Sequence, residues 1–286
     1  MQKSLFRIIL IKTLSYVKFI LNILIYLNQD TEASNMKKPT RVYGQQVDLD
    51  SQNIKDFFNK RAIDFMQNKR TRNTTVLLGD KNTDYADNWN LYEKKHILPV
   101  LDIKPNDTVL DIGCGIGRWA EHLLPLCGKY IGTDISPEMI TAATKLFASK
   151  YNHARFINAS FQETFDNIEI KEKQFNKIII AGVSMYLNDA DLYRCYEQLC
   201  NHLALNGILY LEESVGIKER LSLNNIWSET LNSHYWAVYR TVAEYLKLLK
   251  PLTDYTTVIK HGYLNTLDKK ELQETGHWHI ILRKNI

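Results

Sequence analysis

The sequence predicts an α/β fold: a doubly wound, mostly parallel sheet with an antiparallel last strand and a helical N-terminal cap. From Pro105 onward, apolar strand-like runs alternate with helix-like runs, which is the pattern of βαβ units. Two late strand-like runs, residues 255–264 and 277–285, have no long helix between them, so we expect them to close the sheet as an antiparallel pair. Apolar side chains at helical spacing in residues 50–96 predict the cap.

The length and charge limit the class of protein. With 286 residues the chain can bury a sizeable core. We expect a leader over residues 1–35, a helical cap over 36–96 and the main domain over 97–286. The net charge is +4, and residues 1–35 supply +2 of it. Because the remainder is nearly neutral, a nucleic-acid surface is not expected.

The leader allows two interpretations. Residues 5–27 are apolar but carry Arg7, Lys12 and Lys18 within one arc of a helical wheel, which is typical of a basic helix lying on an anionic membrane surface. Those charges disfavour a spanning helix, and no small-residue cleavage site follows. We therefore expect contact with the inner face of a membrane through residues 1–27. Alternatively Met36 is the true start, and residues 1–35 are not translated.

The elements follow in order. Helices are expected at 51–67, behind Ser51 as a cap, and at 83–103, with the polar segment 69–82 as a turn between them. Ser136 and Pro137 form a good helix start, and the run 175–183 is apolar enough for a strand buried on both faces. Further strands are expected at 108–114, 130–136, 154–160 and 207–214, and further helices at 117–127, 137–151, 189–203 and in an aromatic insertion over 221–249.

The four cysteines, Cys114, Cys127, Cys195 and Cys200, form no CxxC pair and no His/Cys cluster with metal-ligand spacing. We expect them to be buried thiols of a reducing, cytoplasmic compartment, and we expect no metal site.

Three glycines at alternate positions, Gly113, Gly115 and Gly117, follow the first strand, and Asp111 stands just before them. A glycine turn at the carboxyl end of a strand lets the backbone approach a ligand closely, and this crevice is where open α/β sheets bind ligands. The ligand could be a dinucleotide or S-adenosylmethionine. Dinucleotide sites usually have the spacing GxGxxG, whereas the spacing here is GxGxG.

A second acidic residue, Asp134, ends the next strand, where a carboxylate can accept hydrogen bonds from both ribose hydroxyls. This residue alone fits either ligand. The combination of DIGCGIG and TDIS favours S-adenosylmethionine, because that ligand carries an ammonium and a sulfonium but no phosphate.

The segments DIGCGIGRWA, TDISPEMI, FNKIIIAGV and GILYLEES resemble the successive motifs of class I S-adenosylmethionine-dependent methyltransferases over residues 95–286. The resemblance implies a Rossmann-like methyltransferase domain with S-adenosylmethionine as its cofactor. It places the three glycines, with the backbone of Cys114, against the methionyl group and ribose, and Asp111 near the ammonium. It also places Asp134 on the ribose diol, Ile135 on the adenine face, Ser160 and Phe161 at the adenine edge, and Ala181 and Gly182 beside the methionyl group. The family often has an acidic residue in place of Ser160.

The acceptor end of the site is less defined. A hydroxyl acceptor needs a base, and His234 is the candidate base; packing is the competing role. Tyr186 is a second catalytic candidate, and Arg240 could clamp an anionic acceptor or form an ordinary ion pair. Glu212 and Glu213 end the fifth strand. We expect an aromatic roof from Trp89, Tyr92, Trp227, Tyr235, Trp236 and Tyr239, and structural filling by His277 and His279, which face away from Trp278.

The resemblance implies transfer of a methyl group to oxygen or nitrogen of a small molecule such as a metabolite, a sugar or a natural-product intermediate. AGVSMY lacks the NPPY or DPPY turn of DNA amino-methyltransferases, so the expected partner is a small molecule and not a nucleic acid. Two alternatives remain: a non-catalytic protein that binds S-adenosylmethionine, and an NAD-linked oxidoreductase.

Overall fold

The computed structural model describes residues 41–264 and 274–285. The expected leader, residues 1–35, and its membrane-surface helix lie outside the described residues. In the described part, no helix combines the length and hydropathy needed to cross a membrane.

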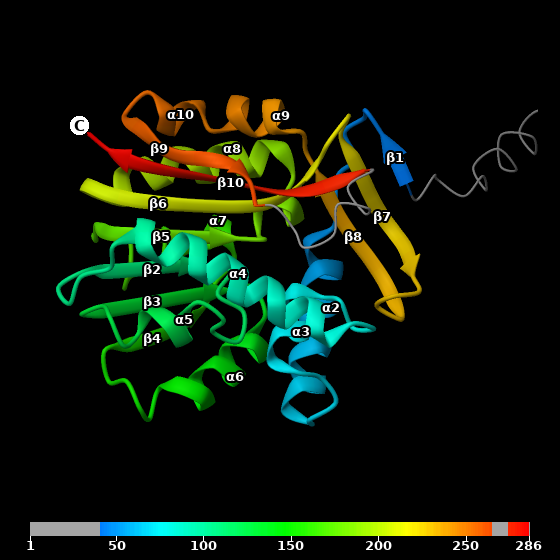
Figure 1. The fold of residues 1–286 in the computed structure, drawn as a ribbon, viewed down its shortest axis with the longest axis horizontal. Helices are drawn as coiled ribbons and strands as arrows, with labels where there is room; N and C mark the ends of the chain where they lie inside the picture. The colour runs from blue at the N-terminus through cyan, green and yellow to red at the C-terminus, as the bar shows by residue number, and fades with distance from the viewer. Residues whose placement is uncertain (1–40, 265–273, 286) are drawn as a thin grey trace, which may run out of the picture. The chain divides into compact units, whose positions relative to one another are not determined.

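A seven-stranded sheet in the order β4-β3-β2-β5-β6-β10-β9 forms the centre of the main unit (Figure 1). Five neighbouring strands are parallel, whereas β10 runs antiparallel to both β6 and β9. The predicted doubly wound sheet with an antiparallel last strand is therefore confirmed. The strands are β2 (Thr108–Ile112), β3 (Lys129–Asp134), β4 (Ala154–Asn158), β5 (Phe175–Ala181), β6 (Leu203–Gly216), β9 (Thr256–Tyr263) and β10 (Thr275–Lys284).

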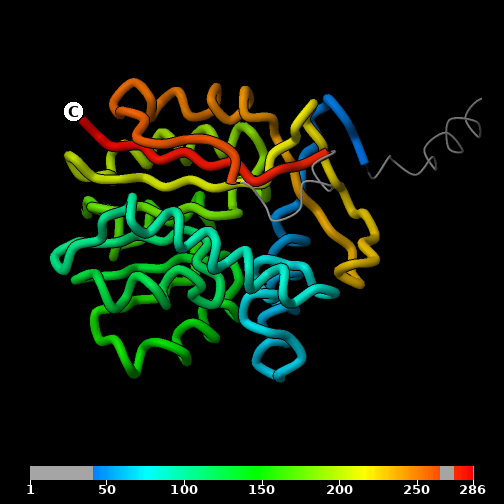
Figure 2. Tube along the Cα trace, viewed as in Figure 1, coloured from blue at the N-terminus to red at the C-terminus, as the bar shows by residue number. Residues whose placement is uncertain are grey.

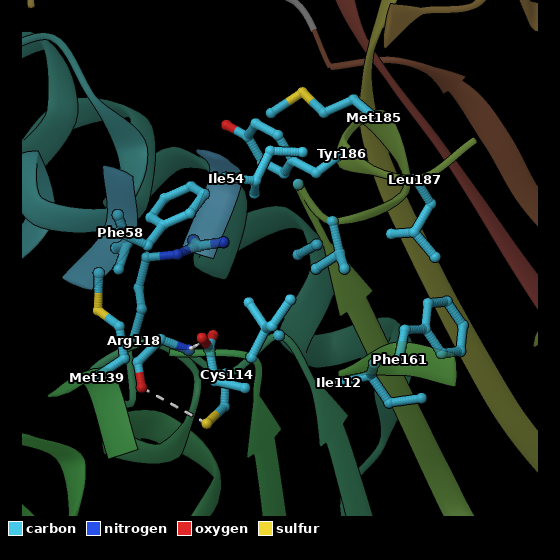
Figure 3. A pocket seen from close by; sticks show the side chains of 18 of the residues that line it. Ile54, Phe58, Ile112, Cys114, Arg118, Met139, Phe161, Met185, Tyr186 and Leu187 are labelled. Carbon is cyan, nitrogen blue, oxygen red and sulfur yellow. Dashed lines mark hydrogen bonds between the residues drawn. The ribbon is translucent and has the colours of Figure 1, made fainter. Parts of the chain in front are cut away.

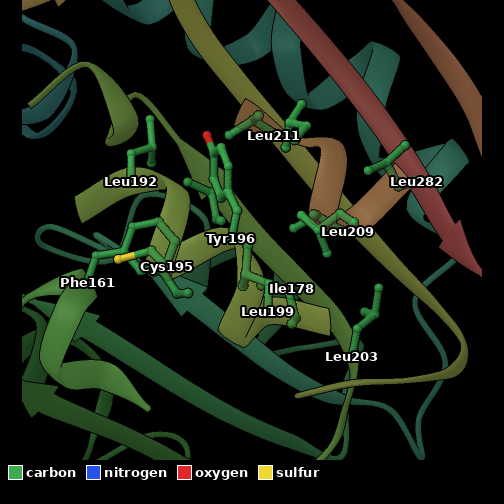
Figure 4. Packing of buried hydrophobic residues seen from close by; sticks show 14 of the residues in the cluster. Phe161, Ile178, Leu192, Cys195, Tyr196, Leu199, Leu203, Leu209, Leu211 and Leu282 are labelled. Atoms are coloured by element: carbon green, nitrogen blue, oxygen red, sulfur yellow. The ribbon is translucent and has the colours of Figure 1, made fainter. Parts of the chain in front are cut away.

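Helices cover both faces of this sheet (Figure 2). Side chains alternate along a strand, so Ile178 and Ile180 of β5 lie in one hydrophobic cluster and Ile179 lies in another. The first cluster packs α8 against the sheet through Leu192, Tyr196 and neighbouring residues (Figure 4). The helices of the sheet unit are α4 (Thr83–Leu101), α5 (Ala120–Leu123), α6 (Pro137–Phe147), α7 (Phe161–Thr164), α8 (Asp189–His202), α9 (Val242–Leu248) and α10 (Lys250–Thr253).

Helix starts follow the expected capping chemistry. The Ser136 hydroxyl accepts a hydrogen bond from the backbone N–H of Met139 at 3.1 Å, and Pro137 occupies the first turn of α6, as predicted. Helix α2 (Ser51–Met66) is capped by Asp50 instead of the predicted Ser51. The Asp50 carboxylate accepts from the backbone N–H of Gln52 at 2.9 Å, so the helix begins one residue earlier than a cap at Ser51 would place it.

The segment 69–82, expected to be a turn, contains the short helix α3 (Arg72–Leu77). The Thr71 side chain caps it by accepting from the backbone N–H of Thr74. The buried guanidinium of Arg61, from α2, donates to the backbone carbonyls of Thr74 and Thr75 and pairs with Asp80. These tertiary contacts stabilise a helix whose own sequence shows little periodicity.

The expected aromatic helix over 221–249 is wrong for most of its length. Residues Leu221–Ser228 form β7 and Ser233–Tyr239 form β8, an antiparallel pair that β1 (Arg41–Tyr43) extends to a separate three-stranded sheet. The correct period is visible in β8, where His234 is exposed and the next residue, Tyr235, is buried. Such alternation at every second residue belongs to a half-buried strand. Only α9, at the end of the segment, is helical as expected.

The end of this hairpin is held to the sheet unit by buried charge. Arg240, which follows β8 and is fully buried, donates to the Asp189 carboxylate and to the backbone carbonyls of Ser184 and Leu187. Arg220, just before β7, forms a two-point ion pair with the same carboxylate at 2.7 and 2.8 Å. Asp189 thus joins both ends of the β7–β8 hairpin to the first turn of α8.

We expect Arg240→Ala to lower the free energy of unfolding by about 3 kcal/mol, because it leaves part of a buried ion pair and two carbonyls without their donor. The matched control is Arg194→Ala, which removes an exposed pair with Asp191 and should change stability by less than about 1 kcal/mol. Urea unfolding followed by circular dichroism measures both. Equal, small effects would show that Arg240 does not anchor the hairpin.

Candidate functional site

A cavity that is partly open to solvent lies at the carboxyl ends of β2, β3, β5 and β6. Two ends of it can be distinguished. The turn end is lined by the glycine turn after β2, by Asp134 and Ile135 after β3, and by residues that follow β4 and β5. The aromatic end is lined by Ile54, Phe58, Tyr186, Tyr235 and Tyr239. Figure 3 shows Phe58 and Ile54 of α2 near Tyr186.

The glycine turn needs residues without a side chain. Gly113 has φ +69° and Gly115 has φ +55°, values that favour glycine. A Cβ on Gly113 would lie 2.3 Å from Val183 Cγ2, and one on Gly115 would lie 2.7 Å from Val76 Cγ1. The backbone therefore lies directly against the cavity. Gly117 is different: its Cβ would strike the Phe147 ring at 2.4 Å, and the residue is outside the cavity lining. Its predicted place against the ligand is not supported by this packing.

Asp134 holds the turn in place. Its two oxygens accept from the backbone N–H groups of Gly115 and Ser136, each at 2.9 Å. Each carboxylate oxygen has a second lone pair, and the residue lines the cavity. Burial raises the pKa of Asp134 to about 6, while the two N–H donors act to lower it. The side chain can therefore serve the turn and a diol at the same time.

Asp111 lies at the end of β2 and is almost fully buried. The Tyr130 hydroxyl donates to it at 2.5 Å, and burial raises the pKa of Asp111 to about 7. The neighbouring Cys114 thiol has a pKa raised well above its usual value by burial. Its backbone N–H donates to Thr133 O at 2.9 Å. Both residues line the cavity. The Cys114 thiol stays protonated, and the backbone hydrogen bond of this residue helps to shape the turn.

The remaining predicted residues of the turn end also line the cavity: Ile135, Ser160, Phe161, Ala181 and Gly182. Ser160 caps α7 in a reciprocal pair with Glu163, which accepts from the Ser160 backbone N–H at 3.0 Å. A Cβ added to Gly182 would meet nothing within 4 Å. The backbone at the end of β5 thus faces open space, as a ligand that rests on it requires.

Glu213 fixes the loop that carries Tyr186. Its carboxylate accepts from the backbone N–H groups of Val183, Ser184 and Met185 at 3.2, 2.7 and 3.2 Å. Burial raises the pKa of Glu213 to about 7. The short helix η1 (Ser184–Tyr186) follows, and the Tyr186 hydroxyl lies 2.9 Å from that of Tyr235. Glu213 was a predicted candidate for the acceptor side. In the structure it holds the loop that carries Tyr186 to the aromatic end.

Two predicted acceptor-side residues lie elsewhere. His234 is exposed on β8, with Nδ1 3.3 Å from Asn225 O, and is outside the cavity lining. It points away because Tyr235, the next residue of the strand, points in. Arg240 is fully buried and its donors are used by Asp189 and two carbonyls. The predicted base and the predicted anion clamp are therefore both wrong.

Of the expected aromatic roof, Trp89, Tyr235 and Tyr239 line the cavity, whereas Tyr92, Trp227 and Trp236 do not. Phe58 and Ile54 were missed, although both lie on the apolar side of the predicted helix that became α2. The amphipathic pattern identified their face, but no sequence signal indicated that this face covers the sheet end.

His277 was predicted to fill space, and the structure places it in the cavity wall. It lines the cavity, its Nδ1 lies 2.8 Å from Glu212 Oε1, and its ring stacks on Trp89 with centroids 4.1 Å apart. The expected alternation with Trp278 is confirmed, because Trp278 packs in the opposite cluster. The pairing of β10 with β6 sets His277 opposite Ser214 and so places it in the cavity wall. This register could not be predicted from the sequence.

Acidic side chains outnumber basic ones along the described cavity wall. Asp111, Asp134 and Glu212 line it, and the basic residues among the described lining residues are Arg118 and His277. Arg118 contacts Glu93 and Asn90. Burial alone would raise the pKa of Glu93, but Arg118 and Lys94 hold it below its usual range. Among the residues that the structure describes, no group of three or more His, Cys, Asp or Glu could hold a metal ion.

The turn end fits S-adenosylmethionine. Asp134 can accept from a ribose diol, the open backbone at Gly182 leaves room beside it, and the acidic wall suits a ligand with sulfonium and ammonium charges. A dinucleotide would bring two phosphates to this wall and to a turn with GxGxG spacing. The arrangement therefore supports the cofactor that the sequence motifs imply.

Residues 109–207 match a family model described as a methyltransferase domain. The chain is 28% identical over 127 residues to nodulation protein S of Bradyrhizobium diazoefficiens, covering 41% of this chain and 58% of that protein. It is 30% identical over 101 residues to ribosomal RNA small subunit methyltransferase A of Dehalococcoides mccartyi, covering 35% of this chain and 34% of that protein. The chain thus spans less than two thirds of these relatives.

The fold is similar to that of phosphoethanolamine N-methyltransferase 1 of Haemonchus contortus, with a TM-score of 0.61 and 17% sequence identity. That likeness covers 82% of this chain and 48% of the solved one. At this identity it establishes the fold and not the substrate.

We expect Asp134→Asn to weaken binding of S-adenosylhomocysteine by about 10- to 100-fold, because a hydrogen bond to a charged acceptor contributes about 1.5–3 kcal/mol. With the pKa of Asp134 near 6, the carboxylate gains a proton as the pH falls. The wild-type affinity should therefore drop below about pH 6, whereas the affinity of the variant should stay flat. Titration calorimetry from pH 5 to 8 measures this, with the exposed Asp166→Asn as control. Unchanged affinity in Asp134→Asn would exclude the diol contact.

Proposed function

Because the chain carries a class I S-adenosylmethionine-dependent methyltransferase domain, we propose that it transfers a methyl group to oxygen or nitrogen of a small molecule. The observation that carries this proposal is the continuous cavity. One end has the glycine turn and Asp134, and the other has aromatic side chains from α2, η1 and β8. A donor bound at the turn end would present its methyl group to an acceptor at the aromatic end.

The residues of the turn end hold the donor. Asp134 accepts from the ribose, the turn backbone approaches the methionyl group, and Ile135 and Phe161 pack beside the adenine. S-adenosylmethionine supplies a methyl group already activated by the positive sulfur. The chain's own task is to place the acceptor atom about 3 Å from that methyl group and to exclude water.

The covering of the aromatic end favours a small acceptor. Phe58 lies edge-on to Tyr186 with ring centroids 5.1 Å apart, and Tyr186 lies edge-on to Tyr235 at 6.2 Å. These contacts tie α2, η1 and β8 together over the cavity. A nucleotide within a folded RNA would have to displace them, even though one relative is named a ribosomal RNA methyltransferase.

The charge of the cavity wall favours a neutral or cationic acceptor. Asp111, Asp134 and Glu212 line it, and Arg118 is engaged by Glu93. An anionic acceptor would lose hydration without gaining an unshared cation. The proposed acceptor is therefore an alcohol, a phenol, a sugar or an amine without a phosphate or carboxylate group.

We further propose a cytoplasmic location. Cys114, Cys127 and Cys195 are buried free thiols, and Cys200 is also free, as is typical of a reducing compartment. Contact with a membrane surface through residues 1–27 stays a prediction from the sequence.

The function is tested with pairs of candidate acceptors that differ in charge: ethanolamine and phosphoethanolamine, glucosamine and glucosamine 6-phosphate, catechol and protocatechuate. Transfer of a tritiated methyl group from S-adenosylmethionine is the readout. We expect turnover in at least one pair, with the neutral or cationic member preferred at least tenfold in kcat/KM. Binding of S-adenosylmethionine without turnover on a wider metabolite panel would favour a non-catalytic binding protein. Preference for the phosphorylated members would contradict the charge argument.

We expect Phe58→Ala to raise KM for the acceptor by about tenfold, because a lost aromatic wall costs on the order of 1–2 kcal/mol of contact. Its affinity for S-adenosylhomocysteine should stay within twofold of wild type. Trp227→Ala is the matched control, since that aromatic side chain is exposed on β7 outside the cavity. If both variants behave alike, the aromatic end is not the acceptor site.

A further inference from the structure

Two residues at the ends of neighbouring antiparallel strands form a histidine–carboxylate pair in the cavity wall. Glu212 lies near the end of β6 and is almost fully buried, with 4% of its side chain exposed, whereas 25% of the His277 side chain is exposed. Oε1 of Glu212 lies 2.8 Å from Nδ1 of His277. Both residues line the cavity.

The contacts fix the orientation of the His277 ring. Its face stacks on Trp89 of α4, with centroids 4.1 Å apart and an interplanar angle of 29°, and its Nδ1 is engaged by Glu212. A carboxylate that accepts from Nδ1–H selects the tautomer in which Nε2 carries a lone pair. Nε2, the second ring nitrogen, can then accept a hydrogen bond from a molecule in the cavity.

The nearby His279 shows what a filling histidine looks like in the same strand. It is 2% exposed, lies outside the cavity lining, and burial lowers the pKa of its ring. It shares the face of β10 with His277 but lies one step further from the strand end. His277 therefore differs from His279 in two ways: its side chain is more exposed, and its Nδ1 lies beside a carboxylate that orients the ring.

We propose that His277 is the general base of the reaction and that Glu212 is its positioning residue. This inference rests on the proposed methyl transfer and narrows the acceptor to a group that carries a proton at neutral pH, a hydroxyl or an ammonium. A neighbouring carboxylate also stabilises the imidazolium that forms when the ring accepts a proton.

The acceptor's O–H or N–H proton passes to Nε2 of His277, and the freed electron pair forms the bond to the methyl carbon. The carbon–sulfur bond breaks with its electrons going to sulfur, which neutralises the sulfonium and leaves S-adenosylhomocysteine. His277 afterwards returns the proton to solvent. A carboxylate acceptor would need no such base.

The first test compares His277→Ala with His234→Ala, an exposed histidine outside the cavity, on the acceptor that turns over best in the charge-matched pairs. General-base removal typically costs about 10²- to 10⁴-fold, so we expect a loss of that size in kcat for His277→Ala. Its affinity for S-adenosylhomocysteine should stay within twofold of wild type, and His234→Ala should keep the wild-type rate. An unchanged kcat in His277→Ala would overturn the proposal.

Chemical rescue distinguishes a base from a filler. Imidazole and a set of methyl- and halogen-substituted imidazoles of similar size are added to His277→Ala. A base predicts that the rescued rate rises with the basicity of the added compound. Rescue that is independent of basicity would assign His277 a packing role and overturn the proposal.

The second test does not depend on finding an acceptor. The full chain is labelled with ¹⁵N-histidine, saturated with S-adenosylhomocysteine and studied by long-range ¹H–¹⁵N NMR, with His277 assigned from the His277→Ala spectrum. We expect the Nδ1–H tautomer in wild type and loss of that preference in Glu212→Ala. An Nε2–H tautomer in wild type would overturn the proposal even if methyl transfer is confirmed. Absence of S-adenosylhomocysteine binding would instead contradict the proposed function.

Discussion

The hydrogen bond from Gly115 N–H to the Asp134 carboxylate is the constraint on which the site depends. It fastens the turn after β2 to the end of β3, so two neighbouring strand ends present one continuous surface. The turn can take this path because Gly113 and Gly115 adopt positive φ and leave no Cβ to strike Val183 or Val76. The same carboxylate that shapes the turn also lines the cavity, where each of its oxygens keeps a second lone pair.

The carboxylates around the cavity divide into those that hold the chain and those that face the cavity. Glu213 holds the loop after β5 through three N–H groups, and Asp189 holds both ends of the β7–β8 hairpin through two arginines. Each has its acceptor capacity used by the protein. Asp134 and Glu212 each support a neighbour and also line the cavity. This division explains why Glu212 and Glu213, adjacent in sequence, have different roles: they point to opposite faces of β6.

The sheet and its turn end could be predicted from local pattern because every parallel strand is a short apolar run and the glycine turn marks its ligand side. The strands within residues 221–239 could not be predicted in this way. An aromatic-rich segment with several polar positions fits both the helical and the strand period, and only its pairing partner decides between them. The place of His277 in the cavity wall could not be predicted for the same reason, because it depends on the register of β10 against β6. Arg240 and His234 carried the right chemistry, but burial and strand alternation direct them away from the cavity.

Most of the aromatic end comes from other stretches of chain than the turn end. The glycine turn, Asp134 and Gly182 fall within residues 109–207, the stretch that matches the family model, and Tyr186 is the one residue of the aromatic end that does so as well. Ile54, Phe58, Tyr235 and Tyr239 fall outside it. Substitutions in α2 or β8 can therefore remodel the aromatic end without disturbing the glycine turn. Natural selection acting on such a molecule can diversify what is methylated while the machinery that delivers the methyl group is inherited intact.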